Sequence, residues 1–255
     1  YADECDLGHQ FDPADLIKPT SSLTGCVPEL RPVRNWYFDL PNFREQLGEI
    51  AENLEADPEV RPVVSQTAKE FLVPPVIYIK NELEADYRAI ESKLPAHEFH
   101  AAEGNKQSFE LEFANIELRD AARDALTAAG IRFRTGKALV PFRISGNVEW
   151  GVKVPEMEGV DDLTVWCWPE SLWAPVSFSA TALEARGEEL SAVRDWWCSP
   201  DARVYQFIGQ DNLYFYGVAQ PALWMALERG NAEVAYPQPG DLQQTTLIAN
   251  HHILF

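Results

Sequence analysis

The amino-acid sequence predicts an α/β fold whose second half contains a parallel β-sheet. Three short apolar runs after residue 141 are the candidate strands: 163–168, 204–208 and 247–255. Segments with helical spacing of apolar residues separate these runs, at 171–197 and at 212–229. Strands that alternate with helices are typical of parallel sheets, because a parallel connection needs a crossover element.

The first 140 residues predict two further parts. Residues 1–40 are loop-rich, because glycine and proline interrupt them repeatedly. Residues 41–140 show a mixed pattern of helices at 42–54, 58–72, 82–94 and 116–129, and of strands at 76–80, 109–113 and 131–135. We therefore expect a connecting segment at 1–40, a helical and α+β insertion at 41–140, and the parallel half at 141–255.

Composition places the chain among globular proteins. Its 255 residues are 46% hydrophobic and include eight Trp and thirteen Phe, enough for a sizeable core. No apolar run approaches the roughly 20 residues of a membrane span, so we expect no membrane association. Four widely spaced cysteines predict a reducing cytoplasm. The net charge of −19 argues against a nucleic-acid surface formed by this segment alone.

The segment 204–216 contains the best candidate binding residues. A buried strand at 204–208 is followed by Gly209, and then by Asp211 and Asn212, which we expect to cap the next helix. This places a carboxylate at the carboxyl end of a parallel strand, where open α/β sheets bind ligands. Such a carboxylate can accept hydrogen bonds from the two hydroxyls of a ribose. The alternative is a turn glycine with a helix cap and no ligand.

Several short segments in a fixed order resemble one family. They lie at 1–41, 147–155, 164–173 and 204–216. In this order they resemble the middle of a methionyl-tRNA synthetase, a class I aminoacyl-tRNA synthetase. The resemblance covers 1–55 and 141–230 and is poor over 56–140. It implies that 141–255 is the second half of a Rossmann-like catalytic domain. It also implies a full-length ligase that activates methionine with ATP and transfers it to tRNA.

The resemblance assigns an ATP-binding role to the Gly-x-Asp segment. Gly209 and Asp211 match family residues that approach the adenosine ribose. The family usually has Arg-Asp ahead of its Trp-Gly, but Gly146 and Asn147 occupy those positions. Loss of an arginine removes a partner for phosphate or carboxylate, so this difference indicates altered activity.

Four aromatic residues match the family's methionine pocket. Trp166 matches the pocket tryptophan, and Phe215 matches a pocket aromatic residue. Trp173 stands where tyrosine is expected, and Tyr216 where histidine is common. A thioether packs well against aromatic edges, so these residues are the predicted amino-acid site. The alternative is that they are core aromatics. Glu170 also replaces the family's proline, and the differences at 170, 173 and 216 leave the identity of the amino acid open.

Residues 1–40 resemble a remnant of the family's zinc knuckle. The expected Cys-x-x-Cys-Gly reads Cys5-Asp-Leu-Gly-His9, so the second cysteine is missing. Cys5, His9 and Cys26 offer three ligands at irregular spacing, whereas structural zinc needs four. We therefore expect this loop to fold without zinc, and we assign no metal-ligating residue in the chain.

Two motifs of class I synthetases are absent from the sequence: His-x-Gly-His and Lys-Met-Ser-Lys-Ser. They stabilise charge in the transition state of amino-acid activation, so we assign no catalytic residue and expect the chain alone to be inactive. The start at Tyr1 and the apolar end predict a piece of a longer protein. The alternative function is a synthetase-derived binding or interaction module that has lost catalysis.

Overall fold

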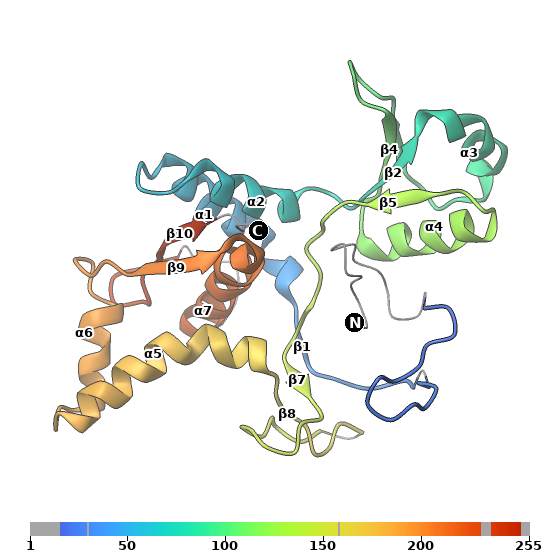
Figure 1. Ribbon diagram of the computed structural model, residues 1–255. Helices are drawn as coiled ribbons and strands as arrows, with labels where there is room; N and C mark the ends of the chain where they lie inside the picture. Colours follow the sequence, from blue (N-terminus) through green and yellow to red (C-terminus); the bar gives the residue numbers. More distant parts are fainter. Residues whose placement is uncertain (1–15, 30, 158, 231–235, 251–255) are drawn as a thin grey trace.

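The computed structural model describes residues 16–29, 31–157, 159–230 and 236–250. Figure 1 shows a larger body, which contains the strands and helices at both ends of the described chain, and a smaller lobe formed by β2 to β5 with α3 and α4. Two extended connections link the lobe to the body (Figure 1). The lobe lies within the segment predicted as an insertion.

The lobe contains a four-stranded antiparallel sheet covered by helices on one face. Its elements are β2 (Val76–Lys80), η3 (Asn81–Leu83), α3 (Glu84–Ile90), η4 (Glu91–Lys93), β3 (Glu98–His100), β4 (Ser108–Glu112), α4 (Ile116–Ala128) and β5 (Phe133–Thr135). The strand order β3-β4-β2-β5 and the chain order βαββαβ define a split βαβ, or ferredoxin-like, arrangement. The sequence predicted both helices and three strands but not β3.

Period-two burial explains why β4 forms a strand here. Phe109 and Leu111 are buried while their neighbours are half-exposed, so alternate residues face the helices. Asn115 caps α4 by accepting a hydrogen bond from the Leu118 N–H at 2.9 Å. Gly130 follows α4 with a φ of +72°, which glycine adopts without strain and which confirms the predicted helix end.

The body is built around a core between helices and two parallel strands. Its helical elements are η2 (Leu40–Phe43), α1 (Arg44–Ala56), α2 (Pro62–Leu72), α5 (Cys167–Ala185), η5 (Leu190–Ala192), α6 (Val193–Trp197), η6 (Gln210–Asn212), η7 (Phe215–Ala219) and α7 (Gln220–Arg229). The largest core cluster unites Leu47 of α1 and Val64 of α2 with Val218 and Leu247. Helices α1 and α2 therefore pack with residues more than 140 positions later, and not with the lobe's own core.

The parallel sheet is smaller than the sequence predicts. Strands β9 (Tyr205–Gly209) and β10 (Thr246–Asn250) pair in parallel and lie side by side in Figure 1. The predicted strand at 163–168 is wrong. Only Thr164–Val165 form a strand, β8, which pairs antiparallel with β7 (Ser145–Gly146). The remaining pair, β1 (Tyr37–Phe38) with β6 (Phe142–Arg143), is also antiparallel.

The strand at 163–168 stops early because a helix begins within it. Trp166 has extended backbone angles and is the residue before α5. Pro169 lies in the first turn of α5, where a missing N–H costs no hydrogen bond. Residues 167 and 168 are therefore helical. The predicted stretch 251–255 lies outside the described residues.

The helix after β9 contains a π-helical turn. Its first turn is η6, its middle is η7 over Phe215–Ala219, and its remainder is α7. Pro221 has no N–H to donate to the carbonyl four residues earlier, and its ring crowds that turn. A wider turn directly before the proline relieves this conflict. Phe215 and Tyr216 are the first two residues of this π-helical turn.

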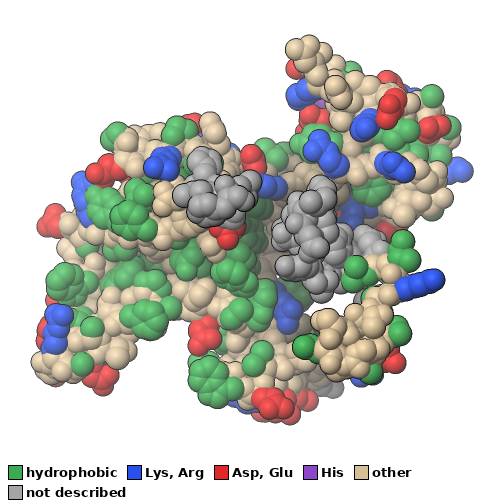
Figure 2. Space-filling view, in the orientation of Figure 1, with side chains coloured by type: hydrophobic (Ala, Val, Ile, Leu, Met, Phe, Trp, Pro, Cys, Tyr) green, Lys and Arg blue, Asp and Glu red, His purple; other side chains and the backbone are tan. Residues whose placement is uncertain are grey.

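The surface carries charge of both signs. Figure 2 shows Lys and Arg side chains interspersed with Asp and Glu, on the lobe as well as on the body. Within the part of the chain that the structure describes, no helix has the length and apolar character required to cross a bilayer.

Candidate functional site

The carboxyl end of β9 brings Gly209 and Asp211 together. Gly209 is the last residue of β9 and precedes η6, with extended backbone angles that any residue can adopt. A Cβ at this position would overlap an Asp211 carboxylate oxygen, so any larger residue would make this carboxylate move from its present position. Asp211 is exposed and lies in the first turn of η6, where a negative charge is favourable.

The predicted capping of this helix is wrong in detail. The residue before η6 is Gly209, and no side chain caps this helix end. Asp211 and Asn212 are instead the second and third residues of η6. The carboxylate is thus held at the end of a strand paired in parallel, without serving as the N-cap.

Trp166 lies where β8 passes into α5. Its backbone N–H donates to the Ile144 carbonyl at 2.8 Å, which fixes it beside the β6–β7 segment. The Arg143 guanidinium carbon lies 5.0 Å from the ring centroid, within the range of a cation–π contact. A Cβ at Gly146 would be 3.3 Å from an Arg143 guanidinium nitrogen. A guanidinium therefore lies beside the position where the resemblance expects an arginine.

The ring that stacks on Phe215 is that of Trp168. Their centroids are 3.9 Å apart and their planes differ by 7°. Both residues are half-buried, and Phe215 also meets Phe142 edge-on at 6.2 Å. Trp168 was absent from the predicted site. Its signal in the sequence is a second large aromatic residue two positions after Trp166, at the start of a helix rather than within a strand.

Trp173 and Tyr216 lie in other surroundings. Trp173 belongs to a separate aromatic cluster, with its ring centroid 6.3 Å from that of the buried Trp224. Tyr216 packs against the largest core cluster and lines a cavity of about 20 Å³ together with Gln220. Phe215 and Tyr216 therefore share the largest core cluster while Trp173 belongs to another, and Phe215 is the one that shares a stack with the start of α5.

Burial shapes the electrostatics around this helix. It raises the pKa of Tyr214, the residue before Phe215, to about 12. Desolvation likewise raises the pKa of the Cys198 thiol. Both groups are therefore neutral at physiological pH. Tyr214 therefore places an uncharged side chain next to the stacked rings of Trp168 and Phe215.

The residues of the predicted knuckle are only partly described. Cys5 and His9 lie outside the described residues. Cys26 is exposed, with its Sγ 3.9 Å from the Thr24 carbonyl oxygen. A group of metal-ligating side chains occurs elsewhere, at Glu98, His100 and Glu112 in the lobe.

The sequence of this chain matches one protein family, and the match includes the strand–helix segment at 205–229. The family model for class I tRNA synthetases (M) matches residues 1–83 and 120–250. The chain therefore belongs to this family, and the predicted resemblance is confirmed. The unmatched residues 84–119 lie inside the lobe and contain α3, β3 and β4.

The chain is similar to part of several methionine–tRNA ligases. It is 27% identical over 238 residues to that of Chloroflexus aggregans, which covers 92% of this chain and 28% of the relative. The Korarchaeum cryptofilum protein is 26% identical, covering 91% of this chain and 30% of the relative. The Nocardioides protein is 25% identical, covering 99% and 32%. The chain thus spans about 30% of the length of these relatives.

Proposed function

We propose that the protein containing this chain is a methionine–tRNA ligase, which activates methionine with ATP and transfers it to tRNA. Family membership supports the reaction class, and the names of the relatives support methionine as the amino acid. One observation carries the proposal. Gly209, Asp211 and Phe215 retain the residue types assigned to ATP and amino acid, at the carboxyl end of a strand paired in parallel.

In this proposal, residues 141–255 are the second half of a Rossmann-like catalytic domain. Strand β9 pairs with β10 on one edge, and no strand among the described residues pairs with its other edge. Phe207, in the middle of β9, is 74% exposed. The unpaired edge presents backbone N–H and C=O groups with which another strand can pair, and the exposed ring leaves a face of the strand open to a further element. We propose that further parallel strands of a longer protein occupy this edge.

The proposed roles follow the geometry at the ends of β9 and β8. Asp211 accepts hydrogen bonds from the ATP ribose, and Gly209 leaves room for its carboxylate. Trp166 and Phe215 line the amino-acid pocket, and Trp168 supports the Phe215 ring from its other side. The Arg143 guanidinium supplies positive charge beside Gly146, in place of the arginine that the family carries there.

Two of the predicted residues have a weaker position in this pocket. Trp173 packs toward Trp224 and Tyr216 toward the core, so we propose that they support the pocket without contacting the amino acid.

ATP is a substrate rather than a bound cofactor. We retain the proposals that the loop at 1–40 holds no tight zinc and that tRNA binds the full-length protein. The free cysteines Cys26, Cys167 and Cys198 support a cytoplasmic location.

A second candidate function is a synthetase-derived binding module without catalysis. The change to Gly146-Asn147, the incomplete knuckle motif at Cys5–His9 and the insertion at 56–140 favour it. The two candidates differ in one measurable property, because only a ligase forms an aminoacyl-adenylate.

Substitution of Asp211 tests the proposed ATP site. In the full-length protein, Asp211→Ala should weaken ATP binding by about ten- to a hundred-fold, since a lost hydrogen bond involving a charged group costs roughly 1.5–3 kcal/mol. Folding should be unaffected, because the side chain is exposed. Asp201→Ala is the matched control, an exposed aspartate just before the amino end of β9. Equal ATP affinities for the two variants would show that Asp211 does not bind nucleotide.

A further inference from the structure

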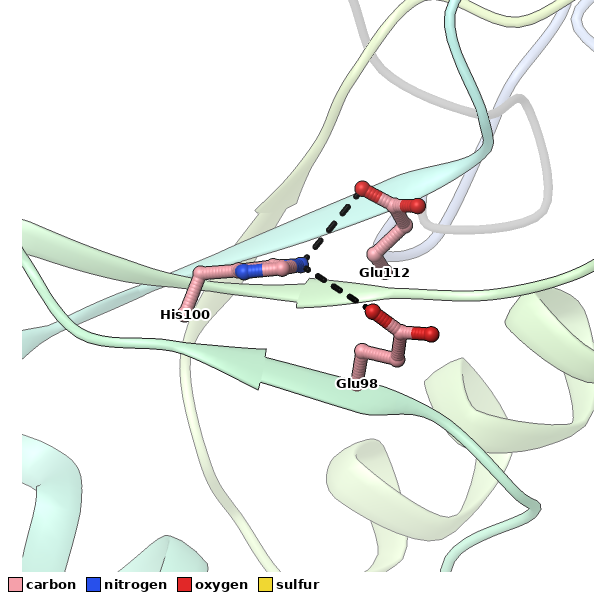
Figure 3. A group of neighbouring side chains, drawn as sticks. All are labelled: Glu98, His100 and Glu112. Carbon is pink, nitrogen blue, oxygen red and sulfur yellow. Dashed lines mark ion pairs between the residues drawn. The ribbon is translucent and has the colours of Figure 1, made fainter.

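Three metal-ligating side chains converge on the open face of the lobe's sheet. Glu98 and His100 come from β3 and Glu112 comes from β4 (Figure 3). Glu98 and Glu112 are directly opposite in the antiparallel register, and His100 is two residues from Glu98. Side chains with this spacing lie on the same face of a sheet. The helices cover the other face, where Phe99 and Leu111 pack.

The distances between the ligand atoms suit a small cation. His100 Nε2 lies 3.5 Å from Glu112 Oε2 and 4.0 Å from Glu98 Oε2. One ligand atom from each of the three residues fits within 4.8 Å. Around an ion with ligands at about 2.1 Å, tetrahedral geometry separates ligand atoms by about 3.4 Å. His100 and Glu112 already have this separation. Glu98 is largely exposed and needs a shift of roughly 1 Å, which its own torsions permit.

The charges on this face favour a dication. Like charges directly opposite each other on neighbouring strands are destabilising. Among the described residues, neither Glu98 nor Glu112 forms an ion pair with a lysine or an arginine, and each pairs with His100 alone. Lys106, on the hairpin between the two strands, pairs with Glu110 at 2.9 Å. Because imidazole ligates a metal in its neutral form, the two carboxylates would bring a charge of −2 to a bound ion, which a divalent ion neutralises.

We propose that Glu98, His100 and Glu112 form a binding site for a divalent transition-metal ion such as Zn²⁺. An imidazole nitrogen favours Zn²⁺, Ni²⁺ or Cu²⁺ over Mg²⁺ and Ca²⁺, which prefer oxygen ligands. Three protein ligands on an open face leave coordination positions for water, so the ion exchanges readily. By linking β3 to β4, it fixes a three-residue edge strand. All three ligands lie in the segment 84–119 that the family model does not match. The site is therefore independent of the proposed ligase function.

Calorimetric titration of the chelator-treated chain with Zn²⁺ tests the site. Because Cys5 and His9 offer other ligands, the informative quantity is the difference between matched variants. We expect the wild type to bind one equivalent more than His100→Ala. Glu112→Gln should lower the affinity for this additional Zn²⁺ by at least about tenfold, because it removes a charged ligand. Glu110→Gln, on the same face and strand, should bind like the wild type. Mg²⁺ should not compete.

A second measurement follows the ligand itself. The imidazole resonances of His100, assigned by comparison with His100→Ala, should shift on addition of one equivalent of Zn²⁺. All variants lie on an exposed or half-exposed surface, and circular dichroism checks that they fold. Equal Zn²⁺ stoichiometry and affinity in wild type and His100→Ala, with unshifted His100 resonances, would overturn the proposal. The three side chains would then lie close together without binding a metal ion.

Discussion

Replacing Trp168 and Phe215 by alanine, singly and together, measures how firmly the start of α5 is held against the π-helical turn. Truncation of a fully buried Phe or Trp costs about 3–5 kcal/mol. Because both rings are half-buried, we expect each single substitution to cost roughly 2 kcal/mol. The stack, with centroids 3.9 Å apart and planes within 7° of parallel, should add a coupling of about 0.5–1.5 kcal/mol.

Urea denaturation followed by far-ultraviolet circular dichroism provides the four free energies of this double-mutant cycle. Trp196→Ala is the control, since its side chain is 61% exposed and its removal should cost less than about 0.5 kcal/mol. The double variant should be more stable than the sum of the two single losses predicts, because the second truncation removes a contact already lost. A coupling below about 0.3 kcal/mol would refute the reasoning, since independent sites give such values.

Two further substitutions test the amino-acid pocket and the buried tyrosine beside it. In the full-length protein, Trp166→Ala should weaken methionine binding more than ATP binding, whereas Trp150→Ala, which removes an 85% exposed ring, should change neither. An equal loss of both affinities would favour a core role for Trp166. Burial raises the pKa of Tyr214 to about 12. Its contribution to stability should therefore fall between about pH 10 and 12, by up to roughly 3 kcal/mol, as the unfolded chain releases the proton first. Tyr214→Phe should remove this part of the alkaline loss of stability, and identical pH profiles would contradict the assignment.

Much of the secondary structure could be predicted from local pattern. The helices α1, α2 and α4 and the strands β2 and β4 follow from apolar spacing, and Gly130 marks the end of α4. These signals lie within one element, so the sequence contains them directly. The sequence does not predict β3, because three residues with one inward side chain show no periodicity. Only the pairing with β4 makes them a strand.

Other features depend on contacts that local pattern does not encode. The apolar run at 163–168 predicts a strand, but the helix that starts at residue 167 moves Trp168 onto the Phe215 ring. The π-helical turn over Phe215–Ala219, directly before the helix that contains Pro221, has no signal in the apolar spacing. The sequence therefore places Gly209 at the end of a strand, as the structure does, while the stacking of Trp168 on Phe215 required the tertiary structure.

The same limit explains the lobe. Its helices and three of its strands were predicted, yet the order β3-β4-β2-β5 depends on pairings between distant residues. The convergence of Glu98, His100 and Glu112 follows from the register of two strands, one of which was not predicted. Neither the sheet order nor the side-chain cluster has a signature in linear sequence.

Methionine-dependent ATP–pyrophosphate exchange tests the central claim most directly. It should be measured for this chain alone and for the product of the complete reading frame. The chain alone should give no exchange above a control without protein, because its sequence lacks both activation motifs. The complete product should give exchange that methionine stimulates more than other amino acids do. Exchange by the chain alone would contradict the incomplete active site, and a complete product without methionine stimulation would contradict the ligase and favour the binding module.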